Sequence, residues 1–343
     1  MAITTVTESA GRQTVLPGAA ARIVRAPLEG PTRPARLLAV FPAAVYVTAA
    51  DGTVLALLTT DAVRLPNAVV LVADRNRAPL TAVVHDGDTA DCGAGVLRIG
   101  GLRVRVARWW TPPRPHPPHD RTALRVGAAE LGALFRSTAG PRPGLPDHGR
   151  AVLTELARHA ARDERPAARA AAARLLGLGP GLTPSGDDVL SGFLLALRHL
   201  VPPAPAGRAG RRGGSPRARE PDEADGVTWL GTRVTALAPG RTTDLSAALL
   251  GHAARGDGCP QAVELIEAVA GHRPVAPALA RLLAVGHTSG ADLGLGVLAG
   301  ARAVLARRPP RRPAEKPEQP EQPEQPEQPE QHSVAEPTGR RTP

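Results

Sequence analysis

The pattern of hydrophobic and polar positions divides the chain into two regions of different secondary structure. Between residues 36 and 108, short runs rich in aliphatic and β-branched residues predict strands at 36–48, 53–59, 68–72 and 97–107. Asp51-Gly52, between the first two runs, is a typical hairpin signal. From Ala128 onward the apolar residues recur with a helical period. The sequence therefore predicts an α+β protein, with a β-rich N-terminal domain followed by a mostly α-helical C-terminal domain.

Glycine and proline mark the ends of several predicted helices in the second region. Gly177, Gly256 and Gly286 stand where C-caps belong, and Pro166 and Pro260 suit first-turn positions. The predicted helices cover residues 128–138, 149–162, 166–176, 187–200, 227–238, 244–254, 261–271, 275–285 and 290–306.

Changes in composition set the expected domain boundaries. We expect a flexible N-terminus at 1–20, the β-rich domain at 21–112 and the helical domain at 113–308. A run rich in proline, glycine and arginine predicts a mobile insertion at 202–226. Residues 309–343 repeat Pro-Glu-Gln and hold almost no apolar side chains, so we expect a disordered tail.

Charge and low aromatic content bear on possible macromolecular partners. The net charge is +10, but the basic residues are nearly all arginines scattered along the chain, and Lys316 is the one lysine. No basic stretch is interleaved with aromatic residues that would stack on bases, so we expect no nucleic-acid partner. His116 and His119 lie in the proline-rich linker from Thr111 to Asp120, where solvated side chains are the expectation and a metal pair the alternative.

Cysteine usage and hydropathy predict a cytoplasmic protein. Cys92 and Cys259 are isolated, and fit neither a disulfide scaffold nor a metal-ligand spacing. The first residues lack the basic and apolar regions of a signal peptide. The longest apolar stretch, from Leu293 to Leu305, is short for a membrane span and is interrupted by glycines and Arg302. We therefore expect no membrane partner.

One short pattern, S-G-x-D-x-x-x-G-x-L, occurs twice in the helical region. The first copy follows a glycine-rich loop, in Gly177-Leu-Gly-Pro-Gly-Leu-Thr-Pro-Ser-Gly-Asp-Asp188. The second follows His287 and Thr288. Both copies read as a loop that leads into the start of a helix, which predicts a paired site. The residues that superpose are Ser185, Gly186, Asp188, Gly192 and Leu194 on Ser289, Gly290, Asp292, Gly296 and Leu298.

A purely structural interpretation explains most of this pattern. A serine at the N-cap with an aspartate three residues later is a capping arrangement, which would pair Ser185 with Asp188 and Ser289 with Asp292. Glycine inside a helix costs roughly 1 kcal/mol relative to alanine, so Gly192 and Gly296 indicate that another backbone comes very close.

A functional interpretation starts from the same positions. The N-terminus of a helix offers unpaired N–H groups and partial positive charge, which suit a carboxylate or phosphate. Asp187 is not needed for a cap and faces Ala291 in the second copy. An acidic side chain beside an anion site indicates either a bridging cation or a ligand that also carries N–H groups.

The glycine motifs resemble those of the AllH family. The resemblance extends to Arg241-Thr-Thr-Asp-Leu-Ser246, which is similar to that family's short Thr/Ser segment, and to the junction at Trp110-Thr-Pro112. It covers roughly residues 20–306. It implies a subunit of an oxamate carbamoyltransferase that splits oxalurate with phosphate into oxamate and carbamoyl phosphate during allantoin (purine) breakdown. It also implies other carbamoyltransferase subunits as partners.

The resemblance and the chemistry together give the candidate site residues. We expect Asp187, Asp188 and Asp292 to accept N–H groups of the substrate or to hold Mg²⁺ against phosphate, and His287 to protonate the leaving nitrogen. The alternative is a non-catalytic scaffold or regulatory subunit, in which the glycine helices only pack. The candidates for binding a small anionic substrate are Gly179, Gly181, Thr183, Ser185, Gly186, Arg241, Thr242, Thr288, Ser289 and Gly290.

Overall fold

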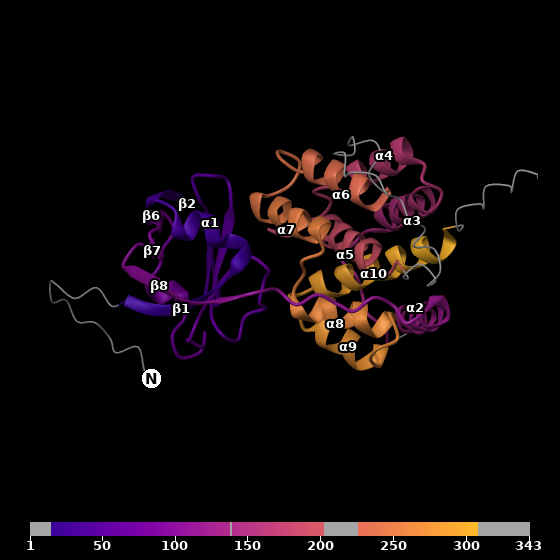
Figure 1. The fold of residues 1–343 in the computed structure, drawn as a ribbon, viewed down its shortest axis with the longest axis horizontal. Helices are drawn as coiled ribbons and strands as arrows, with labels where there is room; N and C mark the ends of the chain where they lie inside the picture. Colours follow the sequence, from indigo (N-terminus) through magenta and orange to yellow (C-terminus); the bar gives the residue numbers. More distant parts are fainter. Residues whose placement is uncertain (1–14, 138, 202–225, 308–343) are drawn as a thin grey trace, which may run out of the picture. The chain divides into compact units, whose positions relative to one another are not determined.

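The computed structural model describes residues 15–137, 139–201 and 226–307. The predicted tail at 309–343 and nearly all of the predicted insertion at 202–226 lie outside these residues. The α+β class is confirmed: all described strands end by residue 110, and all described α-helices except one short helix near the N-terminus follow it (Figure 1).

The N-terminal strands close into a β-barrel, which the sequence did not predict. Going around the barrel, the strand order is β1-β5-β4-β3-β2-β6-β7-β8. A short helix, α1 (Arg25–Glu29), follows β1. The strands are β1 (Val15–Ala21), β2 (Arg33–Phe41), β3 (Ala44–Thr48), β4 (Val54–Leu58), β5 (Ala68–Leu71), β6 (Ala90–Gly93), β7 (Val96–Ile99) and β8 (Leu102–Trp110).

Strand β1 closes the barrel and corrects the expectation of a flexible segment at 1–20. It pairs with β5 on one side and with β8 on the other, from Val15 opposite Arg103 to Ala21 opposite Trp110. Its sequence does not alternate between polar and apolar residues as a surface strand does. Its last two residues, Ala20 and Ala21, are fully buried in the barrel core. A strand of small residues carries a weak β signal, which explains why it was missed.

The helical region contains α2 (Arg121–Arg136), α3 (Asp147–Ala161), α4 (Arg165–Leu175), α5 (Ser185–His199), α6 (Gly226–Leu237), α7 (Asp244–Arg255), α8 (Pro260–Val269), α9 (Val275–Leu283) and α10 (Ser289–Ala306). These match the predicted helices, except that α2 begins about two turns earlier than expected. Asp120 caps it by accepting hydrogen bonds from the N–H groups of Thr122 and Ala123.

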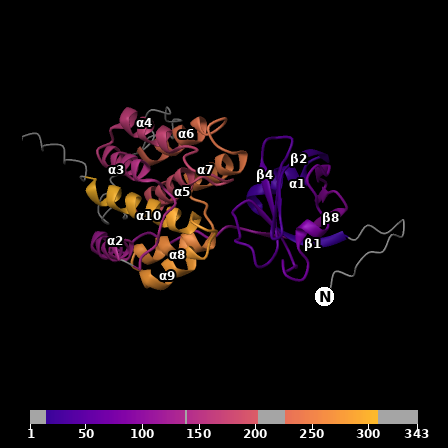
Figure 2. The ribbon, with the colours of Figure 1, turned by 180° about the vertical axis from the view of Figure 1, so that it is seen from behind.

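Helices α5 and α10 lie side by side at the centre of the helical region (Figures 1 and 2). A Cβ on Gly192 would lie 2.1 Å from the carbonyl oxygen of Leu293, and one on Gly296 would lie 2.1 Å from that of Val189. The close backbone approach predicted for these glycines is therefore confirmed. Val189 and Leu293 are equivalent positions of the repeat, so the two helices contact each other in a nearly two-fold symmetric way.

Helix α10 is long and apolar enough, by length and composition, to cross a membrane. It is nevertheless mostly buried inside the protein, where it packs against α5, α3 and α2. This burial is what a core helix of the helical region requires.

Candidate functional site

The two copies of the repeated motif meet at the N-termini of α5 and α10, and their serines and aspartates pair crosswise. The Ser289 hydroxyl lowers the pKa of Asp188, and the Ser185 hydroxyl lowers that of Asp292, so each serine acts on the aspartate of the other helix. The capping prediction was therefore wrong: Pro184 and Thr288 occupy the N-cap positions, and neither helix has a side-chain cap hydrogen bond. Each serine acts on the other helix because the glycine contacts bring the two helix starts together.

Both carboxylate oxygens of Asp292 accept hydrogen bonds from the protein backbone. Asp292 has no exposed surface, and it accepts hydrogen bonds from the backbone N–H groups of Gly144 (3.2 Å) and Leu145 (3.0 Å). Burial raises the pKa of its carboxyl, while the Ser185 hydroxyl and these two N–H groups oppose the rise. The loop before α3 was not predicted to take part in the site. Its sequence, Arg-Pro-Gly-Leu-Pro at 142–146, carries no motif that would have revealed this contact.

Asp187 ties the glycine-rich loop to the loop before α7. Its carboxylate accepts a hydrogen bond from the N–H of Gly177 (2.9 Å) and another from the hydroxyl of Thr242. Gly177 has φ +72°, a conformation that glycine adopts without strain. Burial raises the pKa of Asp187, and these hydrogen bonds oppose it. Asp187 therefore has a structural task that the sequence did not indicate.

The Thr/Ser segment before α7 is also held by internal contacts. Thr243 caps α7, since its hydroxyl oxygen accepts from the N–H of Ser246 (3.0 Å). The same hydroxyl donates to the carbonyl of Leu182 (2.6 Å). Arg241 is exposed beside these residues. This segment thus holds the glycine-rich loop in place through the hydrogen bonds of Thr242 and Thr243.

Asp188 differs from the other two carboxyls because one of its oxygens accepts no hydrogen bond from the described part of the chain. It is 7% exposed, and its Oδ2 is buried with no hydrogen-bond partner among the described residues. Burial raises the pKa of this carboxyl to about 8, and the neighbouring carboxyls Asp292 and Asp187 add to the rise. Ser289 and Thr183 hydrogen-bond to it and oppose the rise.

The backbone N–H groups at the start of α5 are mostly occupied. Gly186 donates to the carbonyl of Leu178 (2.8 Å), and Asp187 and Asp188 both donate to that of Pro184 (2.9 and 3.1 Å). The expectation of free amides that would receive an anion is therefore not supported at this helix. Side-chain hydroxyls and Asp188 are the polar groups that remain for a ligand.

A cavity of about 370 Å³ opens beside Asp188. This is within the size range of small-molecule sites. Its polar lining from the helical region includes Thr183, Asp188, Ser191 and Ser289, and the hydroxyls of Thr183 and Ser289 are 3.3 Å apart. Much of the remaining lining from the helices is apolar, with residues such as Leu195, Leu245, Leu249, Ala262 and Leu293.

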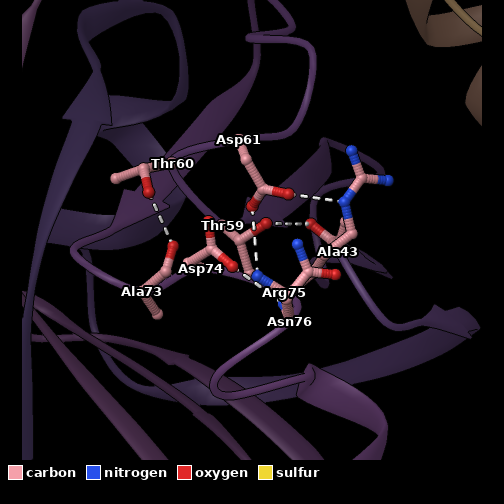
Figure 3. Close-up of polar contacts among 8 residues, drawn as sticks. All are labelled: Ala43, Thr59, Thr60, Asp61, Ala73, Asp74, Arg75 and Asn76. Carbon is pink, nitrogen blue, oxygen red and sulfur yellow. Dashed lines mark hydrogen bonds and ion pairs between the residues drawn. The ribbon is translucent and has the colours of Figure 1, made fainter. Parts of the chain in front are cut away.

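A polar cluster on the barrel loops also borders this cavity through Asp61 and Arg75 (Figure 3). The carboxylate of Asp61 pairs with the guanidinium of Arg75 at 2.5 Å and also accepts from its backbone N–H at 3.2 Å. A hydrogen bond from Thr59, together with those from Arg75, lowers the pKa of Asp61 to about 2. The positive charge of Arg75 is thus largely neutralised by its own partner.

The other predicted site residues lie around this cavity but do not line it. His287 is exposed, and Thr288 precedes α10 at its N-cap. Gly179 and Gly181 have φ values of +118° and +92°, which L side chains rarely adopt, and both are exposed in the loop before α5. Gly186 and Gly290 pack against the carbonyls of Leu175 and Leu282, where a side chain would clash.

No metal centre is formed within the described part of the chain. There, no group of three or more His, Cys, Asp or Glu side chains is placed to hold a metal ion. His116 and His119 are exposed, as expected, but each also has a protein contact: His116 contacts Glu267 at 2.9 Å, and the His119 ring lies tilted against that of His272, with centroids 4.1 Å apart. They anchor the linker to the end of α8.

The helical segment that contains both copies of the motif also matches a known protein family. Residues 175–301 match the family model of the oxamate carbamoyltransferase subunit AllH. The matched range contains both copies of the motif, the Thr/Ser segment, helices α5 to α9 and most of α10. The predicted AllH resemblance is confirmed over this range. No solved structure matches the chain at a significant level.

Proposed function

We propose that this AllH-like chain is a subunit of an oxamate carbamoyltransferase, and that the cavity beside Asp188 binds its small anionic substrate. The reaction would convert oxalurate and phosphate into oxamate and carbamoyl phosphate. The observation that carries the proposal is the meeting of two helix starts of the AllH-matched segment at one cavity, with Asp188, Thr183 and Ser289 on its wall. Other subunits of the enzyme are the expected partners, in the cytoplasm.

The geometry suits a reaction that needs positioning rather than a protein nucleophile. Phosphate itself attacks the carbamoyl carbon, so the protein must orient the two reactants and stabilise the oxyanion that forms there. The hydroxyls of Thr183 and Ser289 lie at the cavity wall and hydrogen-bond to each other at 3.3 Å, so a substrate oxyanion would receive their O–H groups in place of this mutual contact. The apolar lining around them lowers the local dielectric constant, which strengthens each polar contact to the substrate.

A second candidate function is a non-catalytic scaffold or regulatory subunit. The occupied backbone amides of α5 and the structural hydrogen bonds of Asp187 favour it, since both satisfy the motif without a ligand. Packing does not account for the unpartnered oxygen of Asp188, a residue that also lines the cavity. Asp188, rather than Asp187, is therefore the residue that discriminates the two functions.

Matched threonine variants test the proposal in the complete enzyme. The full chain is combined with its partner subunits, and the formation of carbamoyl phosphate from oxalurate and phosphate is measured. Thr183→Ala removes a hydroxyl from the cavity wall, and loss of one oxyanion donor lowers kcat by about 100-fold or more. Thr154→Ala is the control, because Thr154 is exposed on α3 and donates only to Arg150 of its own helix. Equal activity of the two variants would support the scaffold function instead.

A further inference from the structure

Three carboxyl groups lie together at the helix starts, and the described residues supply no cation to any of them. Asp187 and Asp292 each accept two hydrogen bonds from backbone or hydroxyl donors, which stabilise an ionised carboxylate. Asp188 is opposed only by the hydroxyls of Ser289 and Thr183, has no backbone donor, and keeps its Oδ2 without a partner among the described residues. Burial of three unpaired negative charges at one place is too costly, so a proton must reside on the least stabilised of the three.

We propose that Asp188 is a neutral carboxylic acid and donates its proton in a hydrogen bond to an oxyanion of the ligand, a carboxylate or a phosphate, in the cavity. This inference rests on the proposed function and names the chemistry of its binding site. It replaces both of the earlier expectations for Asp188, which were acceptance of N–H groups and coordination of Mg²⁺. It also explains how an acidic residue borders a site for an anion, because a protonated carboxyl carries no charge and supplies a donor.

The groups around Asp188 favour a protonated, uncharged carboxyl, because none of those that the structure describes supplies an unpaired positive charge. Asp187 on α5 and Asp292 on α10 are like charges, and Cys259 at the start of α8 is a buried thiol. Around the same cavity, Asp257 is paired with Arg114 at 3.1 Å and Asp61 with Arg75 at 2.5 Å. Helix α7 contributes only apolar side chains to the lining, namely Leu245, Leu249 and Ala253.

The pseudo-symmetry of the site points to the same conclusion. On the α10 side, Asp292 receives the N–H groups of Gly144 and Leu145, so the loop before α3 fills the space in front of it. On the α5 side, the equivalent Asp188 faces a cavity instead of a loop. The two copies of the repeat therefore differ in their surroundings. In the α10 copy the aspartate binds the backbone of a loop, and in the α5 copy the aspartate lines a cavity that is available to a ligand.

Binding measurements on the full-length chain as a function of pH test the proposal. The probes are oxamate, which carries a carboxylate, inorganic phosphate, and oxamide, which replaces the carboxylate by a second amide. Wild type is expected to bind oxamate and phosphate but not oxamide. Because only the protonated form of Asp188 donates, oxamate affinity should fall about tenfold per pH unit above the pKa of Asp188, near 8. Oxamate binding that strengthens with pH, or equal binding of oxamide, would overturn the proposal.

Two variants separate donation from acceptance. Asp188→Asn keeps an N–H donor but does not titrate, so it should bind oxamate within about tenfold of wild type and lose the pH dependence. Asp188→Ala should lose binding. Complete loss of binding in Asp188→Asn, with a native circular dichroism spectrum, would instead show that Asp188 accepts hydrogen bonds.

Infrared spectroscopy gives a readout that does not depend on ligand binding. Wild type at neutral pH should show the C=O band of a protonated carboxylic acid, and Asp188→Asn should lack that band. Absence of the band in wild type refutes a protonated Asp188 whatever the chain binds. Absence of oxamate and phosphate binding in wild type, with the band present, refutes the anion site and with it the proposed function.

Discussion

At the scale of single residues, neighbouring aspartates of one motif have different tasks. Asp187 and Asp188 are adjacent in sequence, yet Asp187 faces two loops and Asp188 faces the cavity. Asp292, which matches Asp188 in the repeat, is enclosed by backbone donors. The side chain's surroundings therefore decide whether a carboxyl of this motif fixes the fold or is available to a ligand.

The structural role of Asp187 predicts a stability cost for its replacement. In Asp187→Asn one carboxylate oxygen becomes an NH₂ group, which cannot accept from both Gly177 and Thr242. The free energy of unfolding should fall by about 1–3 kcal/mol, as for a buried hydrogen-bond partner left unsatisfied. Urea unfolding measures this. Asp244→Asn is the control, because Asp244 is exposed and pairs with Arg36 at the surface, so its loss should cost less than about 1 kcal/mol. Equal values for the two variants would contradict the role of Asp187.

The raised pKa of Asp188 predicts how stability changes with pH. Its pKa rises from an ordinary 3.8 to about 8 in the folded protein, so the folded state binds the proton more tightly than the unfolded state. The contribution to stability is complete below pH 3.8 and is lost as pH rises through 8. Urea unfolding across this range should show a steeper decline for wild type than for Asp188→Asn. Parallel profiles would show that Asp188 titrates normally.

At the scale of elements, the contact between α5 and α10 places both helix starts at one site. Gly192, Gly296 and Gly300 allow the two backbones to touch, and a Cβ on Gly300 would lie 2.9 Å from the carbonyl oxygen of Phe193. All residues of α5 from Ser185 to Leu197 are buried, because α4, α6, α7, α8 and α10 surround it. The site is thus built on the most enclosed helix of the helical region.

Glycine-to-alanine substitutions test the importance of this helix contact. Gly192→Ala places a methyl group 2.1 Å from a backbone carbonyl that cannot move away easily, so it should cost about 3 kcal/mol or more. Gly251→Ala in α7 is the control. The nearest atom to its Cβ would be a guanidinium nitrogen of Arg255 at 3.5 Å, so alanine should be neutral or stabilise the helix by up to about 1 kcal/mol. Thermal unfolding of both variants measures the difference. A stable Gly192→Ala protein would show that the helices separate without cost.

At the scale of the whole molecule, the sequence predicted the helices better than the barrel or the site. Helical periodicity and the placement of Gly256 as a C-cap in the left-handed conformation are local signals, and the structure confirms both. Barrel closure depends on the pairing of β1 with β8, residues nearly ninety positions apart at Val15 and Arg103, which no local pattern records. The crosswise serine and aspartate pairs and the Gly144 contact were missed for the same reason.

The repeat itself was the most useful signal for the site. Two equivalent helix starts were expected to serve one ligand, with Asp188 and Asp292 on the same side of one pocket. The helix starts do meet, but only Asp188 lines the cavity, whereas Asp292 is held by the backbone N–H groups of Gly144 and Leu145. The assignment of tasks within the site did not follow from the sequence. Capping geometry, the partners of Asp187 and the isolation of Asp188 depend on loops that come from three different parts of the chain.

A crystal structure of the full-length chain with oxamate tests the central claim most directly, namely that this chain carries the small-anion site. We expect oxamate in the cavity, with a carboxylate oxygen within hydrogen-bonding distance of Asp188 and with Thr183 and Ser289 as further donors. Oxamate bound elsewhere on the chain, with the Asp188 cavity filled only by water, would contradict the account.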